Sequence, residues 1–363
     1  MNNSMSSQDS SILAETYPSQ SHASAIAAAA QRSSAPVPSN RPFASLMRRL
    51  RESEAFTSVM LRSFRALQRV GINVTPNHFY WPIPDVSELE SREWPANDSA
   101  LTFDFHFEKQ LHLMRKVSAA YRNEWNFPEK ASEEFGGYHY NNGFFETVDA
   151  EMAYSLVREY KPARIIEIGS GFSTRVLAAG LQANQLDGLG GELITIDPMP
   201  ERLPINGFSN RVTVIPHKVQ DVDLELFQCL GKNDILFIDS SHVVATGSDV
   251  VREYLEILPS LPSGVLVHVH DIFLPSDYPR NMVVKNLCFW SEQYMLQAFL
   301  TFNSSFEVIW GSSAMQAFYP EALEAAFPHW KDSYEMLPSG SRRWVPSADG
   351  QHVWPSSFWM KRI

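Results

Sequence analysis

The sequence predicts an α/β protein built on a doubly wound, mostly parallel sheet. From about residue 138, short apolar segments alternate with segments of helical periodicity. Two apolar segments, Ile235–Ile238 and Val265–Val267, are continuous, as in strands that are covered on both faces. A glycine-rich turn follows the first strand at 164–168. In such sheets, ligands bind at the carboxyl ends of the strands.

The expected strands and helices alternate along residues 138–363. We expect strands at 164–168, 192–197, 211–215, 234–239 and 264–269, and two more near 305–310 and 356–362, which makes a seven-stranded sheet. We expect helices at 149–160, 174–182 and 246–258. Crossover helices between parallel strands cover both faces of the sheet, so the core lies in two layers.

The N-terminal part of the chain follows other patterns. Residues 1–41 are rich in Ser, Ala, Gln and Pro and predict a disordered tail. Residues 42–137 predict a helical and aromatic cap, and residues 138–363 the α/β domain. Within the cap we expect amphipathic helices at 43–70, an irregular segment at 76–100 that prolines interrupt, and a helix near 105–122.

Two features of the cap region have alternative interpretations. The arginines between residues 43 and 70 fit a solvated helix face, a surface for an anionic substrate, or the interface of a homodimer. The aromatic residues Phe79, Tyr80 and Trp81 lie among prolines, and we expect them to be buried. They would either pin a loop against the main domain or line a ligand pocket.

Composition and charge exclude several classes of protein. The net charge is −11 and the pI is about 5.5, which argues against broad binding to nucleic acid. No apolar run reaches the roughly 18 residues of a membrane span, and the first residues do not resemble a secretory signal. Cys229 and Cys288 provide neither a disulfide framework nor zinc spacing, so we expect both to be buried. We therefore expect a soluble cytoplasmic protein.

The run from Arg164 to Arg175 carries the clearest functional signal. An apolar strand enters a turn that contains Gly169 and Gly171, where the missing Cβ atoms let a ligand approach the main chain. Glu167 lies within the strand, where a charge needs a partner. Its carboxylate would bond loop amides or receive a cationic ligand. A lone Gly-x-Gly after a strand is common, so the turn by itself is weak evidence for a nucleotide-type ligand.

Asp197 ends the second strand in the run Leu-Ile-Thr-Ile-Asp-Pro. In doubly wound folds an acidic residue at this place accepts hydrogen bonds from ribose hydroxyls. An aspartate before a proline is also commonly a turn or helix-capping residue. Because the glycine turn precedes it, we favour the ribose role.

Acidic residues and histidines lie at the ends of the next two strands. The fourth strand ends in Asp239-Ser240-Ser241-His242, and the fifth in His268-Val269-His270-Asp271. Such a cluster suits acid/base chemistry or substrate positioning by His242 or His270 with Asp239. It also suits hydrogen bonds that only hold the strand ends, or a metal site of Asp239, Asp271 and a histidine. We rank these interpretations in that order, and predict no metal.

Together these residues resemble class I S-adenosylmethionine-dependent methyltransferases, and in particular a bacterial branch of small-molecule O-methyltransferases of secondary metabolism. The motifs are Glu167–Thr174, Ile196-Asp197, Phe237–His242 and His270–Phe273, and the resemblance covers about 138–363. It implies a Rossmann-like methyltransferase fold with S-adenosylmethionine as the cofactor. Two positions depart from the pattern: Ser173 replaces a glycine, and Ile272 replaces the asparagine of metal-dependent catechol-type enzymes, which weakens the metal interpretation.

The resemblance also implies roles for single residues. Glu167, Gly169, Ser170 and Gly171 would face the methionine part of the cofactor, Asp197 its ribose, and Asp239 and Ser240 its adenine or sulfonium side, while Tyr140 and Asn142 would close over the methionine end. The catalytic candidates are His270, His242 and Asp239.

Three functions remain open at this point. The first is methyl transfer to a hydroxyl or amine of a small metabolite, with a histidine taking the proton. The second is implied by relatives of this branch, the azetidine-2-carboxylate synthases, which cyclise the amino-acid part of the cofactor and release methylthioadenosine. The third is a non-catalytic scaffold of the same fold.

Overall fold

The computed structural model describes residues 54–75, 77, 80–92, 102–130, 134–140, 142–200, 212–336, 342–344 and 355–363. The chain divides into two compact units, Met1–Pro76 and Asn77–Ile363. In the first unit, the described helix α3 (Glu54–Gln68) confirms part of the helical prediction for 43–70. The predicted tail at 1–41 lies outside the described residues.

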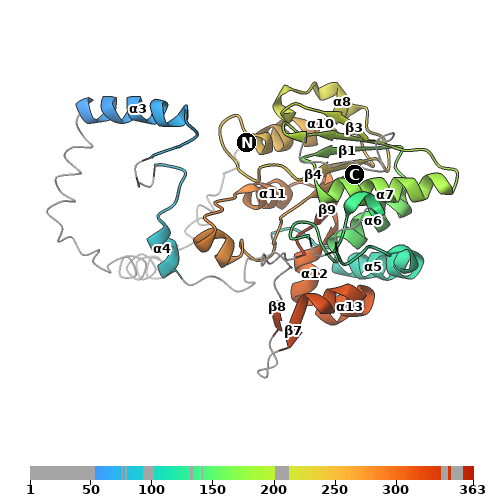
Figure 1. Ribbon diagram of the computed structural model, residues 1–363. Helices are drawn as coiled ribbons and strands as arrows, with labels where there is room; N and C mark the ends of the chain where they lie inside the picture. Colours follow the sequence, from blue (N-terminus) through green and yellow to red (C-terminus); the bar gives the residue numbers. More distant parts are fainter. Residues whose placement is uncertain are drawn as a thin grey trace, which may run out of the picture. The chain divides into compact units, whose positions relative to one another are not determined.

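The second unit is built on the predicted doubly wound sheet (Figure 1). Its strands are β1 (Arg164–Ile168), β2 (Glu192–Ile196), β3 (Val212–Ile215), β4 (Ile235–Ile238), β5 (Leu266–Val269), β6 (Phe306–Gly311) and β9 (Phe358–Arg362). The order is β3-β2-β1-β4-β5-β9-β6, and β1 to β5 pair in parallel. Strand β9 runs antiparallel to both β5 and β6. The predicted fold class is therefore confirmed. Strands β7 (Tyr334–Met336) and β8 (Arg342–Trp344) pair antiparallel in a separate two-stranded sheet.

The chain reverses at β1, because β2 and β4 flank β1 on opposite sides. Ligands of doubly wound proteins bind in the crevice at this switch point, outside the carboxyl ends of the strands. The residues that follow β1, β2, β4 and β5 therefore lie at the edge where a ligand is expected.

Helices cover both faces of the sheet (Figure 1). One layer contains α5 (Phe107–Tyr121), α6 (Asp149–Tyr160), α7 (Phe172–Leu186), α12 (Ser312–Phe318) and α13 (Pro320–Ala326). The other contains α8 (Leu224–Gln228), α9 (Asp249–Arg252) with η5 (Glu253–Ile257) and α10 (Leu258–Ser260), and α11 (Glu292–Thr301). Short turns of helix lie at η1 (Arg122–Glu124), η2 (Glu134–Gly137), η4 (Val219–Asp221), η6 (Asn281–Lys285) and η7 (Pro328–Ser333).

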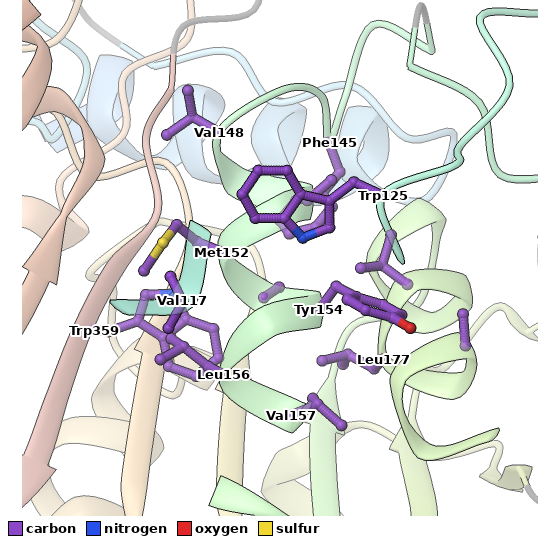
Figure 2. Close-up of a cluster of buried hydrophobic side chains, with 14 of the residues drawn as sticks. Val117, Trp125, Phe145, Val148, Met152, Tyr154, Leu156, Val157, Leu177 and Trp359 are labelled. Atoms are coloured by element: carbon purple, nitrogen blue, oxygen red, sulfur yellow. The ribbon is translucent and has the colours of Figure 1, made fainter. Parts of the chain in front are cut away.

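Alternate strand residues divide between two hydrophobic clusters, as the pleat requires. Ile165 of β1 belongs to the cluster under α5, α6 and α7, and its neighbour Ile166 to the cluster under α8, η5 and α11. Figure 2 shows the first cluster, in which Met152 and Leu156 of α6 pack near Trp359 of β9. Burial on both faces explains why these strands read as continuous apolar runs.

A buried arginine ties α6 to neighbouring segments. Arg158 donates from Nε to Oε2 of Glu124 at 2.8 Å, from Nη1 to Oδ1 of Asn184 at 2.6 Å and from Nη2 to Oδ2 of Asp187 at 2.8 Å. A buried guanidinium is tolerated when it is paired in this way.

The structure corrects three expectations from the sequence. Helix α4 (Val86–Ser91) lies within the segment predicted to be irregular. Its N-cap is Asp85, whose carboxylate accepts hydrogen bonds from the backbone N–H groups of Ser87 and Glu88, and prolines flank the helix without interrupting it. Tyr80 is 83% exposed and Trp81 41%, so neither is buried as expected, and Phe79 lies outside the described residues. Cys229 is exposed and Cys288 is half-buried.

Among the described residues, no helix is both long and apolar enough to cross a bilayer. The proposed division at residue 137 between cap and α/β domain stays a prediction. Helix α5 of the predicted cap packs on α6 through the same hydrophobic cluster that covers the sheet.

Candidate functional site

The glycine turn after β1 packs against the end of β4. Gly169 has a φ of +86°, and a Cβ at this position would lie 1.9 Å from the carbonyl oxygen of Asp239. Only glycine fits this left-handed conformation and close approach. A Cβ at Gly171, by contrast, would meet no atom within 4 Å. The turn therefore leaves space beside Gly171, at the switch point of the sheet.

Glu167 fastens the turn to the first turn of α7. Its carboxylate is buried and accepts hydrogen bonds from Ser173 Oγ at 2.8 Å and Thr174 Oγ1 at 2.7 Å. Burial raises the pKa of Glu167 to about 8. These two hydroxyls take the place of the loop amides or cationic ligand that the sequence predicted as partners of Glu167. The position expected of Glu167, facing a cofactor, stays a prediction.

Asp197 also contacts the turn. Its Oδ2 accepts hydrogen bonds from the backbone N–H of Ser170 at 3.1 Å and from the Ser170 hydroxyl. Its Oδ1 accepts from the backbone N–H of Met199 at 2.7 Å, which is the turn contact considered as the alternative. The structure thus gives Asp197 a turn role and places its half-buried carboxylate beside the glycines. The ribose role stays a prediction.

The residues at the ends of β4 and β5 meet, as predicted from their neighbouring strands. Oδ1 of Asp239 lies 3.5 Å from Nε2 of His242 and 3.5 Å from Nδ1 of His270. Oδ2 of Asp271 lies 3.4 Å from the same nitrogen of His242 and 3.7 Å from that of His270. Both imidazoles are buried, while the two carboxylates are partly exposed. Each of the two carboxylates therefore lies near both imidazoles at this edge of the sheet.

Two of these residues adopt left-handed backbone conformations. His242 has a φ of 60° and Asp271 a φ of 55°. Such conformations are costly for residues other than glycine, and the surrounding structure must hold them. The carbonyl of His242 accepts hydrogen bonds from the N–H groups of Ser291 and Glu292, and Ile272 N–H donates to the carbonyl of Ser356. Strain held in this way is typical of a functional site.

Three further buried carboxylates lie behind the cluster, and one of them contacts an imidazole at hydrogen-bond distance. Nδ1 of His242 lies 2.8 Å from Oε2 of Glu292, which is fully buried at the start of α11. Nε2 of His270 lies 3.7 Å from Oδ2 of Asp149, the first residue of α6. Ser240, beside Asp239, donates from Oγ to Oε2 of buried Glu253 at 3.2 Å. No sequence pattern predicted that Glu292, Asp149 and Glu253 would lie at this site.

The electrostatics of the cluster follow from burial and from these pairs. Burial works against the charged form of His242, but the carboxylates of Asp239 and Glu292 outweigh it and raise its pKa well above the usual value. The same holds for His270, whose pKa Asp271 and Asp239 raise. Burial also acts against the charge on Asp239, yet the two imidazoles lower its pKa. The shifts therefore favour the ionised form of Asp239 and the protonated form of both imidazoles.

His268, deeper in β5, is a structural residue. It is fully buried, its Nε2 lies 2.9 Å from Ser357 Oγ, and its ring stacks on Phe237 with centroids 3.7 Å apart. Burial lowers its pKa well below the usual value, so the ring is neutral.

Asn142 shapes the loop before α6. Its Oδ1 accepts hydrogen bonds from the N–H groups of Phe144 and Phe145, and its Nδ2 donates to the carbonyls of His139 and Phe145. Tyr140 is buried and stacks on His329, with centroids 4.4 Å apart. Their expected closure over the methionine end of a cofactor stays a prediction.

Asp239, His270 and Asp271 each offer one ligand atom, and these atoms lie within 4.8 Å of one another. Such a donor set suits a divalent metal ion. An imidazole must lose its proton before it binds a metal, and the raised pKa of His270 opposes that loss. The absence of a metal stays a prediction.

Comparison with known proteins points to one family. Residues 166–272 match the family described as a methyltransferase domain. An uncharacterised protein of Archaeoglobus fulgidus is 32% identical over 186 residues, which span 49% of this chain and 82% of that protein. Weaker likenesses include the O-methyltransferase of Bacillus cereus in complex with SAH (15% identity, 70% of this chain and 91% of that chain, TM-score 0.30). Another is mitomycin 7-O-methyltransferase (16% identity, 85% and 84%, TM-score 0.32).

The match at 166–272 begins in β1 and ends just after β5, so it spans the glycine turn, Asp197 and the His–Asp cluster. The chain belongs to one family with the archaeal protein and carries a methyltransferase domain, which implies S-adenosylmethionine as its cofactor.

Proposed function

We propose that this protein transfers a methyl group from S-adenosylmethionine to a hydroxyl or amine of a small metabolite. One observation carries the proposal: the glycine turn, with Asp197 bonded to it, shares the carboxyl edge of the sheet with a buried His–Asp cluster. A cofactor cradle and an acid/base cluster thus meet within a methyltransferase domain. The resemblance to small-molecule O-methyltransferases of bacterial secondary metabolism supports this acceptor class.

The residues of the turn fit the cofactor. Gly169 takes a conformation that other residues avoid, and Gly171 leaves its side of the turn open. Asp197 keeps lone pairs beyond those it uses for Ser170 and Met199, so it can also accept hydrogen bonds from ribose hydroxyls. We assign Ser170, Ser240, Tyr140 and Asn142 to the surroundings of the cofactor. When bound, S-adenosylmethionine supplies a methyl group on an electrophilic sulfonium.

His242 is the best placed base. Its Nδ1 lies 2.8 Å from Oε2 of Glu292, and its Nε2 faces the partly exposed carboxylates of Asp239 and Asp271. A base that a third group orients in this manner is the usual arrangement for proton abstraction. His242 would take the proton of the acceptor through Nε2, while Asp239 stabilises the imidazolium that forms. His270, on the other side of Asp239, is the second candidate.

The raised pKa of His242 sets a condition on this chemistry. Its imidazole must lose a proton before it can accept one from a substrate, and the raised pKa disfavours that loss. The rate of methyl transfer should therefore still rise with pH above the ordinary histidine pKa near 6.5.

Incubation of the full-length chain with S-adenosylmethionine tests the reaction type. With no acceptor we expect no turnover, and with a panel of small alcohols and amines we expect S-adenosylhomocysteine together with a methylated product. If the cofactor alone gave methylthioadenosine and a cyclised amino acid, cyclisation would replace methyl transfer. If no panel member or metabolite extract gave turnover although the cofactor binds, the scaffold interpretation would gain support.

A further inference from the structure

We propose that Arg175, with the N-terminus of α7, forms an anion-binding subsite that holds the carboxylate of the cofactor's methionine part. This assignment rests on the proposed use of S-adenosylmethionine. It gives a role to Arg175, the last residue of the run singled out in the sequence, to which no role was assigned there.

Arg175 carries a buried charge that no described acidic residue compensates. The residue is 8% exposed, and its Nε has no hydrogen-bond partner. Among the described residues it forms no ion pair. Arg158 is buried to the same extent, yet it bonds Glu124, Asn184 and Asp187. A buried guanidinium costs free energy unless an anion compensates it, so the missing partner is expected to be a ligand.

Burial lowers the pKa of Arg175, in contrast to Arg158, whose pKa is raised. The guanidinium stays protonated in spite of this shift. Its Cζ lies 4.5 Å from the centroid of the Phe172 ring, three residues earlier on α7. A cation–π contact of this kind fixes the direction of the guanidinium but does not neutralise its charge.

The start of α7 adds a second, independent donor set. The helix is 15 residues long, and its N-cap, Gly171, has no side chain to satisfy the first N–H groups. Ser170 N–H donates to Asp197 and Gly171 N–H donates to Thr174. Within the described part of the chain, the N–H groups of Phe172 and Ser173 have no acceptor. Unused N–H groups and the helix dipole both favour an anion here.

The neighbours of Phe172 indicate which end of the cofactor this subsite takes. The Phe172 ring lies edge-on to His139 at 5.3 Å and stacks with Phe144 at 6.1 Å. These two residues flank Tyr140 and Asn142, in the loop proposed to close over the methionine end. At the other side of the turn, the carboxylate of Asp197 would repel an anion. The anion therefore belongs to the methionine part and not to the ribose side.

Ligands with and without the amino-acid part test the assignment. We would titrate the full-length protein calorimetrically with S-adenosylhomocysteine and with 5′-methylthioadenosine. The variant Arg175→Met should bind S-adenosylhomocysteine at least about tenfold more weakly, the scale of one lost charge-assisted contact. Its affinity for 5′-methylthioadenosine should stay within about twofold of wild type, because this ligand has no carboxylate and loses no hydrogen bond with the arginine.

Two more variants sharpen the result. Arg175→Lys keeps the charge and should recover part of the affinity for S-adenosylhomocysteine, although a lysine lacks the planar fork. Arg115→Met, on the exposed face of α5, should change neither affinity. Decarboxylated S-adenosylmethionine should bind wild type and Arg175→Met equally, because it retains the amine but has no carboxylate.

An equal loss for both ligands would overturn the assignment and make Arg175 a structural residue, and so would unchanged binding of S-adenosylhomocysteine. If Arg175→Met did not fold, Arg175→Lys would be titrated with the same two ligands, and the assignment would require a weaker affinity for S-adenosylhomocysteine alone. Failure of wild type to bind either ligand would instead overturn the proposed function itself.

Discussion

The Nδ1 atom of His242 lies 2.8 Å from Oε2 of Glu292, a residue fifty positions further along the chain. The backbone reinforces the contact, because the carbonyl of His242 accepts hydrogen bonds from the N–H groups of Ser291 and Glu292. Side chain and main chain thus fix both the left-handed conformation of His242 and the direction of its ring. Glu292 is a positioning residue for the proposed base.

Glu292→Gln should lower kcat at least about tenfold, because general-base catalysis contributes about 10²–10⁴-fold and depends on the orientation of the base. The affinity for S-adenosylhomocysteine should stay close to wild type, since Glu292 lies behind the imidazole. Steady-state kinetics with an accepted substrate, together with calorimetry, would measure both. Glu256→Gln, an exposed change on η5, is the control and should alter neither value. An unchanged kcat for Glu292→Gln would contradict the proposed role of His242.

Activity and stability should respond to pH in opposite directions. The base form of His242 appears only above its raised pKa, so kcat/KM should rise with pH beyond the ordinary histidine value near 6.5. The raised pKa values of His242 and His270 stabilise the fold below the unfolded pKa, and this contribution is lost as the pH rises through the folded values. Glu167, with a pKa of about 8, acts in the same direction.

The pH profile of kcat/KM and the Tm over the same range would test this. The melting temperature should fall where the activity rises. A kcat/KM that levels off below pH 6.5 would show that a group with a lower pKa acts as the base.

Gly169 and Gly171 form a matched pair for mutation. Gly169→Ala should destabilise the fold by about 1–3 kcal/mol, because it combines a strained φ of +86° with a clash against the carbonyl of Asp239. Gly171→Ala should leave Tm unchanged, since its added Cβ meets no atom within 4 Å, and should still weaken cofactor binding. Thermal unfolding and calorimetry of both variants measure the two effects. Full affinity in Gly171→Ala would show that the cofactor does not approach this side of the turn.

Asp197→Ala should weaken the binding of S-adenosylmethionine at least about tenfold, the scale of one lost charged hydrogen-bond partner. Asp197→Asn keeps one acceptor oxygen, so it can accept from Ser170 or from Met199 but not from both, and we expect it to weaken binding as well. Asp223→Ala, at an exposed position, is the control for a lost carboxylate. Unchanged affinity in Asp197→Ala would refute the ribose assignment.

Periodicity predicted the parts of the fold that depend on burial. The helix expected at 149–160 and the strand at 164–168 coincide with α6 and β1, because each buries a regular set of apolar side chains. The proximity of Asp239 and Asp271 was also predictable, because each follows the carboxyl end of a strand and the two strands are parallel neighbours. Helix α4 was missed because six residues are too short for a periodic signal, and its evidence is the local cap at Asp85.

The supporting residues of the site could not be predicted in the same way. Glu292 and Asp149 each start a helix, where an acidic residue is ordinary, and only the tertiary fold brings them to His242 and His270. Arg175 had no signal either, since an arginine in the first turn of a helix normally faces water. Their roles depend on burial and on contacts between segments that are distant in the sequence.

Calorimetric titration of the wild-type protein with S-adenosylmethionine tests whether the glycine turn and Asp197 hold this cofactor. We expect saturable binding of one cofactor per chain, which Asp197→Ala and Gly171→Ala weaken. The absence of binding to the folded wild-type protein would contradict it.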